Sequence, residues 1–452
     1  MKQYKVKKGY DIPITGKPEA NLIDAPNPDS FAINPEEFHG VKPRLHIKEG
    51  DSVKIGSPLF EDKNYPAVQF CSPAAGKISE IQFGPRRVVK RISISGGGHD
   101  VVQHETFRVA DISGAAPDKL RELLLKGGIW PLIRQRPFDV IARPDSKPKS
   151  IFINCMDTAP LAGDAGFALQ GQFAEFEAGI EALKVLGHNV PVHVVLNPNG
   201  KQDDFLKANG VQFHAFAGKH PAGLVSTHIE KIDRIQGATD TVWYLTAYQT
   251  VQLGSFLLQG QYPQERVVTV TGSGAQKRQY YRIRNGAVLK SILRDNLAAG
   301  EQRIIAGNVL TGRHVGPDDA PSFYSNQITV IPEGRERHFM AWLSPGFSRW
   351  TYSRAYVSGW MPGKKFSMHT NMNGEHRALV KTGDYNHVMA LDILPDFLAK
   401  AILAEDVELM EKLGILECAP EDFALCSYIC PSKTEFTEII KEGLDMMRAE
   451  LT

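Results

Sequence analysis

The clearest pattern of hydrophobic and polar positions in this chain lies between residues 151 and 199. An apolar run at 151–153 leads into a loop, a helical pattern follows, and a second apolar run occupies 190–195. In the helical part, five large apolar side chains recur at alternating steps of four and three, a spacing that keeps them on one helical face. These side chains are Leu169, Phe173, Phe176, Ile180 and Leu183. Gly187 is predicted to end the helix in the left-handed conformation, which glycine adopts without a Cβ clash.

Strand, helix and strand within about 45 residues predict a βαβ unit, and therefore a parallel sheet with the helix on one face. Ligands of parallel sheets bind at the carboxyl ends of the strands. In this unit that position is the loop at residues 154–166, which begins Asn-Cys-Met-Asp-Thr-Ala-Pro. Apolar runs near 212–216 and 242–246 predict further strands.

Short apolar runs between glycines and prolines at residues 41–82 predict small antiparallel strands. The marks Gly-Asp-x-Val at Gly50 and Pro-x-x-Gly at Pro73 resemble those of the flattened barrel of lipoyl and biotinyl carrier domains. In that family a lysine at a hairpin tip is modified. Lys63 lies four residues after Leu59 and ten before Pro73, which is not the central position of the carriers. We therefore interpret the segment as a structural barrel.

Two strands, a helix and a strand are predicted at 267–272, 279–283, 286–293 and 303–307, an order that suggests a ubiquitin-like β-grasp module. The glycines at 272–274 do not form a phosphate loop, because the Gly-x4-Gly-Lys-Ser/Thr spacing is missing.

The remainder of the chain is predicted to be an aromatic-rich segment followed by helices. Most of the aromatics between 321 and 373 are expected to be core residues. A helical pattern from 391 to 413 is broken at Pro395 and closed by Gly414, and a last helix is expected at 433–451.

The predicted organisation is an α/β multidomain protein with five regions. They are an N-terminal region with a lipoyl/biotinyl-like barrel-sandwich (1–105), a Rossmann-like α/β domain (106–258), a β-grasp module (259–330), an aromatic-rich connection (331–390) and a C-terminal helical domain (391–452).

Composition and charge are those of an ordinary globular chain. With 452 residues the chain is too long for one core, and 42% apolar residues with a net charge near +1 give no case for nucleic-acid binding. The charge is uneven, however. Residues 391–452 hold 14 acidic and 5 basic side chains, whereas 266–303 hold 8 Lys or Arg against 2 acidic residues. Such a split marks a solvated face or a docking surface.

Targeting signals and disulfides are not expected. No run approaches 18 apolar residues, and the N-terminal residues lack the apolar core of a signal peptide. Five cysteines, an odd number in a long chain, do not suggest a secreted disulfide framework, so a cytoplasmic protein is expected.

Cys418, Cys426 and Cys430 form the motif Cys-x7-Cys-x3-Cys-Pro. An iron–sulfur cluster usually needs four closely spaced thiolates. Because Cys71 and Cys155 are remote in sequence, the motif favours a relic of a cluster-binding loop over an intact cluster site. The fourteen histidines are scattered without a His-Glu-x-x-His pairing, so metal catalysis has no support.

Four motifs carry a resemblance to a known family. They are Lys-Lys-Gly-Tyr-Asp-Ile-Pro-Ile-Thr-Gly-Lys-Pro at 7–18, Leu-Phe-Glu-Asp-Lys at 59–63, the segment 377–395 around Met-Ala-Leu-Asp-Ile-Leu-Pro, and Asp-Phe-Ala-Leu-Cys-Ser-Tyr-Ile-Cys-Pro at 422–431. On these motifs, nearly the whole chain resembles the A subunit of the Na⁺-translocating NADH:quinone reductase. Ala390 stands where that family often has proline, a difference that affects only a local turn.

The resemblance implies an architecture similar to the flavin subunit of respiratory complex I and the C subunit of the Rnf complex. Those relatives bind FMN with a glycine-rich loop and an acidic Asn-x-Asp/Glu-x-x-Glu-Pro loop, and they hold an iron–sulfur cluster. In this chain the first loop shrinks to Gly127 and Gly128, and the second, at 154–160, has Ala159 at the second carboxylate position. These residues argue against FMN, NADH and a cluster on this chain.

The resemblance further implies a peripheral subunit on the cytoplasmic side of the bacterial inner membrane, in a complex that couples quinone reduction to Na⁺ export. Its expected partners are five other subunits, including integral membrane subunits, and FAD, FMN and iron–sulfur centres are expected on them. Ubiquinone or menaquinone would be the substrate, and the isolated chain would be an incomplete enzyme.

Three functional hypotheses follow. The chain contributes to a quinone site; or it is a docking scaffold with a vestigial cavity; or, as a weaker alternative, it is an intact flavoenzyme. A quinone needs an apolar, aromatic slot with donors for its carbonyls. We expect that slot between 127–138 and 154–167, with three aromatic walls and two donors. The predicted walls are Trp130, Phe138 and Phe167, and the predicted donors are Arg134 and Asn154.

Overall fold

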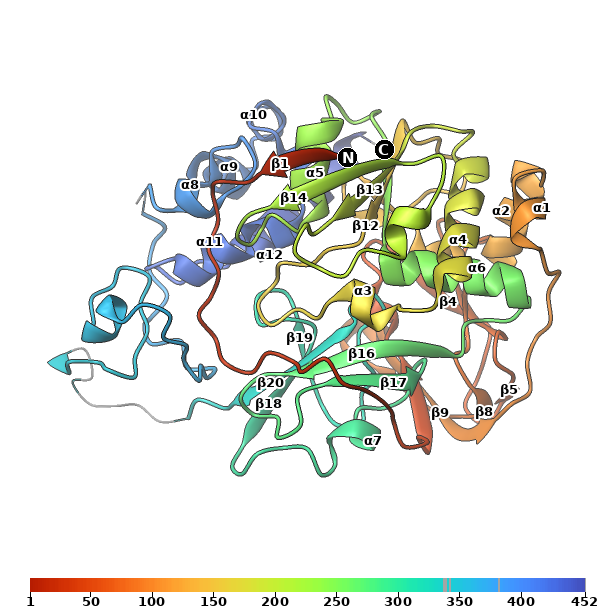
Figure 1. The fold of residues 1–452 in the computed structure, drawn as a ribbon, viewed down its shortest axis with the longest axis horizontal. Coiled ribbons are helices and arrows are strands. Elements are labelled where there is room, and N and C mark those ends of the chain that lie inside the picture. Colours follow the sequence, from red (N-terminus) through yellow and green to blue (C-terminus); the bar gives the residue numbers. More distant parts are fainter. Residues whose placement is uncertain (336–339, 341–342, 381–382, 452) are drawn as a thin grey trace.

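The fold is that of a computed structural model that describes residues 1–335, 340, 343–380 and 383–451. Four β-sheets and a group of C-terminal helices make up the described chain (Figure 1). The α/β sheet lies between helices, the two barrel sheets lie beside it, and a mixed sheet lies below it in this view.

The α/β sheet has seven strands in the order β1-β14-β13-β12-β15-β10-β11. Their bounds are β1 Lys2–Lys5, β10 Arg134–Arg136, β11 Val140–Ile141, β12 Ser150–Asn154, β13 Val192–Leu196, β14 Gln212–Ala217 and β15 Val242–Thr246. The five strands from β1 to β15 are parallel, with Ile151 opposite Val192 on β13 and opposite Trp243 on β15. The predicted βαβ unit and both further strands are therefore confirmed.

Helices cover both faces of this sheet (Figure 1). α4 Phe173–Leu186 and α6 Ala247–Gln259 lie on one face, and α5 Val225–Ile232 lies on the other. α1 Val109–Ile112 and α2 Pro117–Lys126 pack against α4, and α3 Ala165–Ala168 is a single turn that precedes α4. Side chains alternate along β12: Ile151 and Ile153 pack in the core under α4 and α6, while Phe152 packs in the opposite core with Val225 and Ile229 of α5. Burial on both faces explains why these strands are continuous apolar runs.

The helix of the βαβ unit differs from its prediction at both ends. Leu169 is the C-cap of α3, so it lies outside α4, which carries the other four predicted side chains. Gly187 ends α4 with φ −84°, and the left-handed residues are His188 and Asn189. Our prediction for the conformation of Gly187 was wrong. Glycine suits the close packing at this position, where a Cβ would lie 2.8 Å from Cδ1 of Ile151 and 3.1 Å from the Leu183 carbonyl oxygen.

Close packing of α4 against α6 also depends on glycine. A Cβ at Gly179 would overlap the carbonyl oxygen of Thr250, and one at Gly254 would overlap the carbonyl oxygen of Glu175. The two helices therefore approach backbone to backbone. Thr246 caps the N-terminus of α6, because its hydroxyl accepts from the Gln249 amide while the Gln249 side chain accepts from the Thr246 amide.

The barrel region consists of a four-stranded sheet, β3-β9-β8-β5, and a three-stranded sheet, β4-β6-β7. Their strands are β3 Ser30–Ile33, β4 Pro43–Leu45, β5 Ser52–Val53, β6 Pro58–Asp62, β7 Gln69–Cys71, β8 Ala75–Phe83 and β9 Val89–Gly98. All neighbouring strands are antiparallel, as the sequence predicted. Lys63 is exposed immediately after β6.

The mixed sheet has the order β19-β18-β20-β16-β17-β2. Its strands are β2 Leu22–Asp24, β16 Glu265–Thr271, β17 Tyr280–Arg284, β18 Gln302–Ala306, β19 Arg313–Val315 and β20 Gln327–Pro332, and α7 is Lys290–Leu293. The predicted strand, strand, helix and strand are present, although α7 has only four residues. The last strand, β20, lies parallel to β16 and antiparallel to β18.

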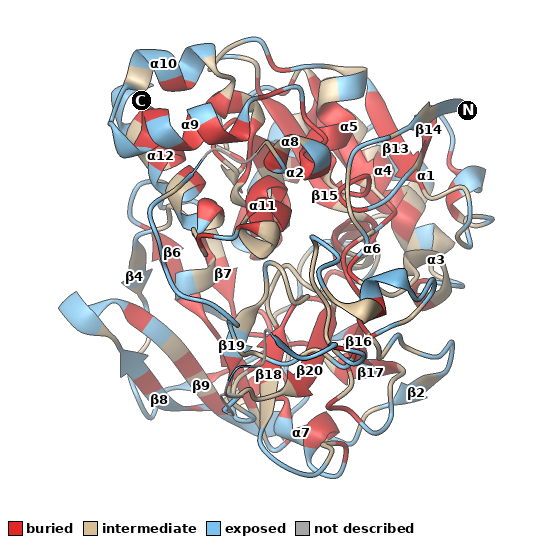
Figure 2. Cartoon of the chain, turned by 90° about the vertical axis from the view of Figure 1, so that its left-hand side faces the viewer, coloured by how far each residue is buried: buried red, intermediate tan, exposed pale blue. Residues whose placement is uncertain are grey.

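The C-terminal helices pack around their own core (Figure 2). They are α8 Tyr385–Val388, α9 Pro395–Leu403, α10 Val407–Lys412, α11 Ala424–Ile429 and α12 Phe436–Leu451. We predicted that Pro395 breaks a helix, but it starts α9, because the first helical turn needs no amide donor there. Gly414 has φ 88° after α10, in agreement with the predicted stop.

The N-terminal segment joins sheets formed mainly by later residues. β1 pairs with β14 of the α/β sheet, and β2 pairs with β17 of the mixed sheet. Among the described helices, none combines the length and apolar character that crossing a bilayer requires.

Candidate functional site

The candidate ligand loop, residues 155–164, leaves the carboxyl end of β12 and is hydrogen-bonded to a turn at 220–223. Nδ2 of Asn154 donates to the carbonyl oxygen of Gly223 at 2.8 Å. The amide of Gly223 donates to Oγ1 of Thr158 at 2.8 Å, and that hydroxyl lies 3.2 Å from Nδ1 of His220. A Cβ at Gly223 would lie 2.6 Å from the Thr158 amide nitrogen. One side of the loop is therefore closed by its own chain.

The mixed sheet closes the other side of the loop. The amide of Asp164 donates to the Tyr280 hydroxyl at 2.7 Å, and Nε2 of Gln327 donates to the Pro160 carbonyl oxygen at 3.0 Å. Gly163 is so close to β16 that a Cβ there would lie 2.6 Å from Cγ2 of Thr269. The polar groups of this side of the loop are therefore used in contacts with the mixed sheet.

The two glycines at 127–128 are explained by packing. A Cβ at Gly127 would overlap the ring of Phe256 on α6. Gly128 has φ 69°, and a Cβ there would lie 2.6 Å from Sγ of Cys71 on β7. These glycines let the end of α2 fit between α6 and the barrel, which is a structural requirement independent of any phosphate.

A buried charge cluster lies at the antiparallel edge of the α/β sheet. Nη2 of Arg134 is 2.7 Å from Oδ1 of Asp139 and also donates to the Asp139 carbonyl oxygen at 3.0 Å. Nη2 of Arg136 is 3.6 Å from the same carboxylate, and the Tyr244 hydroxyl donates to it. Burial alone would raise the pKa of Asp139, but the two arginines lower it to about 2.

The same cluster connects the α/β domain to the C-terminal helices. Arg136, 1% exposed, donates through Nη1 to the Cys418 carbonyl oxygen at 3.3 Å and through Nη2 to Oε1 of Glu421 at 3.2 Å. Burial raises the pKa of Glu421 to about 7 and that of its neighbour Asp422 to about 6. Our sequence reasoning missed Arg136, Asp139 and Glu421. Their one signal was a pair of arginines inside an otherwise apolar stretch.

The five residues predicted to line a quinone slot lie in different surroundings. Trp130 is fully buried in the largest core, where its Nε1 donates to the Ala142 carbonyl oxygen at 2.7 Å. Phe138 packs in the core of the C-terminal helices, and Phe167 packs edge-to-face on Tyr280 at 4.7 Å. Arg134 and Asn154 donate to groups of the chain itself. The structure therefore does not bring the five together around one cavity.

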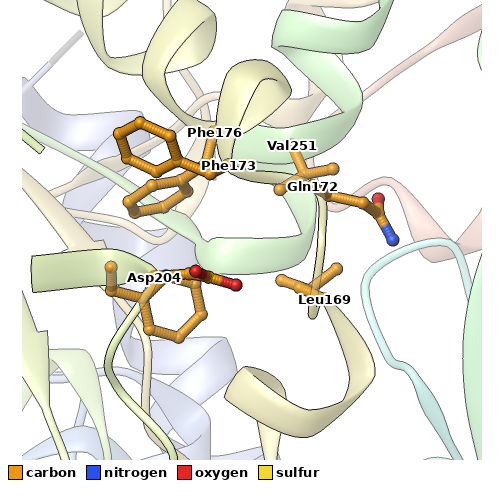
Figure 3. Close-up of a pocket in the computed structure, with 7 residues that line it drawn as sticks. Leu169, Gln172, Phe173, Phe176, Asp204 and Val251 are labelled. Atoms are coloured by element: carbon orange, nitrogen blue, oxygen red, sulfur yellow. The ribbon is translucent and has the colours of Figure 1, made fainter. Parts of the chain in front are cut away.

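Surface pockets of the described chain lie elsewhere, two of them beside α6. One, of about 170 Å³, lies between the α3–α4 junction, Phe205 and Val251 of α6 (Figure 3). Its walls are Phe173 and Phe176, with the carboxylate of Asp204 at its rim. The other pocket, of about 480 Å³ and partly continuous with solvent, lies where the barrel, α6 and the mixed sheet meet.

The three C-terminal cysteines are buried in one apolar core. Sγ of Cys418 donates to the Gly414 carbonyl oxygen at 3.4 Å, and Sγ of Cys430 lies 3.0 Å from the Tyr385 hydroxyl. Burial raises the pKa of Cys418 and of Cys426, which favours the neutral thiol over the thiolate that a metal requires. Within the described ranges, no three His, Cys, Asp or Glu side chains are arranged to hold a metal ion.

Three protein-family models match successive parts of the chain. The model of the NqrA N-terminal barrel-sandwich hybrid domain matches residues 4–96, that of the NqrA second alpha/beta domain matches 115–262, and that of the NQRA C-terminal domain matches 267–316. Curated relatives match over almost the full length. The chain is 35% identical over 447 residues to the A subunit of the Na(+)-translocating NADH-quinone reductase of Neisseria meningitidis serogroup B, with 99% of both chains covered. The chain belongs to this family.

Other members of the family agree with this assignment. The proteins of Saccharophagus degradans and Pasteurella multocida are each 36% identical, and 98–99% of this chain and 99% of each relative are covered.

Of solved structures, an NAD⁺-reducing [NiFe]-hydrogenase in the H₂-reduced state matches with a TM-score of 0.37 and 12% identity over 76% of this chain and 63% of that one. The curated relatives extend through the C-terminal helices, beyond the last residue that the three family models match.

Proposed function

We propose that this chain is a peripheral, cytoplasm-facing subunit of a Na⁺-translocating NADH:quinone reductase that holds no flavin, nicotinamide or iron–sulfur cluster of its own. The observation that carries the proposal is the closure of the loop after β12. Its amide, hydroxyl and carbonyl groups bond to the turn at 220–223 and to the mixed sheet, so a nucleotide there would have to break several internal hydrogen bonds.

On this proposal the chain is a docking subunit, and the redox centres lie on its partners. FAD, FMN, iron–sulfur centres and the sodium path belong to the five other subunits, some of them integral membrane proteins. The charge distribution supports docking. The C-terminal helices are acidic and the segment at 266–303 is basic, and charged surfaces of this kind attract partner surfaces of the opposite charge. Exposed apolar side chains on the C-terminal helices, among them Leu403 at 58% exposed, fit a protein interface.

Two parts of the chain are assigned to known fold types as part of this proposal. We infer that the domain around β12 is Rossmann-like and that the mixed sheet is a β-grasp module. The hairpin β16–β17, the short α7, the pair β18–β19 and the insertion of β20 between β16 and β18 support the second assignment.

Contribution to a quinone site is a second candidate function. The pocket of Figure 3 favours it, since Phe173, Phe176 and Phe205 form an apolar wall and Gln172 offers an amide donor. In this conformation the pocket has no room for even a water-sized sphere, so a quinone ring enters only if side chains of its wall move. Trp130, Arg134, Phe138, Asn154 and Phe167 require a larger rearrangement to act together.

Absorbance of the purified chain tests the absence of a redox centre. A colourless protein is expected, and stoichiometric flavin or cluster absorbance would refute the proposal. Titration with a soluble quinone separates the two candidate functions. Saturable tryptophan quenching that disappears in Phe173→Trp, which fills the pocket, would establish a quinone site. No saturable quenching is the result expected for a docking subunit.

Co-purification tests docking directly. Glu411→Lys reverses a charge on the exposed side of α10, and it is expected to lower recovery of the chain with the assembled complex. Glu19→Lys, exposed in the N-terminal segment, is the matched control and should leave recovery unchanged. If both variants are recovered with the complex as well as the wild-type chain is, the docking interface does not include the exposed side of α10.

A further inference from the structure

The larger pocket lies at the meeting point of three parts of the chain. About 480 Å³ of space between the barrel, α6 and β16 is free of protein atoms; most of it is continuous with solvent, and about 40 Å³ admits the centre of a water-sized sphere. Polar side chains from all three parts line it: Asn34, Glu37, Gln252, Tyr262, Arg266 and Asn285. This concentration of polar groups is unusual for a gap between domains, because such gaps are normally filled by apolar side chains or paired charges.

Arg266 of β16 is the unusual member of this group. It is 9% exposed, and its Nη1 donates to the carbonyl oxygens of Ser322 at 2.9 Å and Phe323 at 3.3 Å. Its Nε is shielded from solvent and has no hydrogen-bond partner among the described residues. Across the same residues, no carboxylate lies within 4.0 Å of its guanidinium nitrogens.

Other arginines show that an unpartnered Nε alone is not the distinguishing feature. Among the described residues, five arginines have a buried Nε without a partner. Four of these five form ion pairs with carboxylates: Arg91, Arg121, Arg136 and Arg313. In the part of the chain that the structure describes, Arg266 is the one of the five that lacks such a pair. Burial lowers the pKa of Arg266 to about 10, so the side chain is still charged at neutral pH.

The carboxylate of Glu37 is close but already used. Its Oε1 accepts from Arg313 at 2.9 Å and from Nδ2 of Asn34 at 3.0 Å, while Oε2 accepts from the Phe323 amide at 2.8 Å. Arg313 also pairs with Glu36, at 3.2 Å on the solvent side. Glu37 therefore attracts Arg266 only at longer range and does not satisfy its donors.

We propose that this pocket binds the carboxylate group of a small molecule, with Arg266 as its charge partner. A planar guanidinium matches a carboxylate in shape and offers parallel donors to it. The amide of Gln252 and the hydroxyl of Tyr262 line the same space and supply further hydrogen bonds. Because the pocket is formed by the barrel, α6 and the mixed sheet together, its ligand stabilises their mutual arrangement.

Acetate is the probe for this site, used with the full-length chain. Sodium acetate is expected to raise Tm saturably, and sodium chloride at the same ionic strength is not. In Gln252→Leu the acetate dissociation constant from calorimetry should rise at least threefold, and in Arg266→Gln at least tenfold. Arg294→Gln, an exposed arginine of the same basic segment, controls for general attraction of anions and should bind as wild type does.

Several outcomes would overturn the inference. One is a shift in Tm that rises without saturation, and another is equal binding by wild type and Gln252→Leu. A third is an equal, saturable rise in Tm with inorganic phosphate, which would show that the pocket binds oxyanions in general rather than carboxylates. Gln252 is only half-buried and its replacement breaks no side-chain hydrogen bond to another described residue, so this variant keeps the test valid even if Arg266→Gln does not fold.

Discussion

His228 in α5 is predicted to make the α/β domain sensitive to mild acid. The imidazole is fully buried against Phe216, with ring centroids 4.5 Å apart. Its Nε2–H donates to the Ala222 carbonyl oxygen at 2.9 Å, and Nδ1 has no partner among the described residues. Burial lowers the pKa of His228 to about 3, from an ordinary value of 6.5. The perturbation that tests this is His228→Gln, which keeps an N–H donor and removes the basic nitrogen.

The sign and size follow from proton linkage. Between the folded pKa of about 3 and the unfolded value of 6.5, only the unfolded chain binds the proton. The stabilising effect of a neutral His228 is therefore complete above pH 6.5 and is lost as the pH falls towards 3. At pH 5 the loss is about 2 kcal/mol, and the limit, reached below pH 3, is about 5 kcal/mol because each unit of pKa shift corresponds to about 1.4 kcal/mol.

Urea denaturation at pH 7.5 and pH 5.0 measures this effect. The fall in the free energy of unfolding between the two pH values should be about 2 kcal/mol smaller in His228→Gln than in wild type. His314→Gln, which changes an exposed imidazole, is the matched control and should follow wild type. If His228→Gln and wild type lose the same free energy on acidification, His228 is not held neutral by burial and the reasoning is wrong.

Three further predictions concern packing, charge and capping. Gly254→Ala should lower Tm, with a loss of about 1–3 kcal/mol, because the methyl group meets the Glu175 carbonyl oxygen, whereas Gly237→Ala, with open space around it, should leave Tm nearly unchanged. Asp139→Asn should lower the free energy of unfolding, measured by urea denaturation at pH 7, by about 2 kcal/mol. The difference from wild type should disappear as the pH falls from 3.8 through 2, because the wild-type carboxylate then becomes protonated too. Thr246→Ala should lower stability by about 1 kcal/mol in thermal unfolding, while Thr246→Ser should retain most of it.

The parallel sheet could be predicted from the sequence because its signals are local. The apolar runs of β12 and β13 and the helical spacing of α4 are each contained in fewer than twenty residues. Gly187 shows the limit of such signals. This glycine marked the helix end correctly, but its φ is not left-handed, and its close packing against Ile151 is a tertiary contact that no local rule contains.

The charge cluster could not be predicted because its partners are far apart in sequence. Arg136 of β10 meets Glu421, which lies between α10 and α11 and is 285 residues away along the chain. A charged residue in a short strand is ordinarily expected to face solvent. The quinone slot was expected from a pair of neighbouring loops, yet the side chains of Trp130 and Phe138 point into different cores. The direction of each side chain depends on tertiary packing, which the local pattern does not contain.

The pairing of β1 with β14 has a consequence for how this protein is made. Lys2 leaves the ribosome about 210 residues before His214, the residue opposite it in the sheet. Until β1 pairs with it, β14 is an open edge whose backbone groups can pair with another chain. The N-terminal strand is therefore synthesised first but can join the α/β sheet only after β14 has been made. Bulky groups attached beside β1 are thus expected to reduce soluble yield more than equal groups attached after α12, which ends at Leu451 and forms no sheet edge.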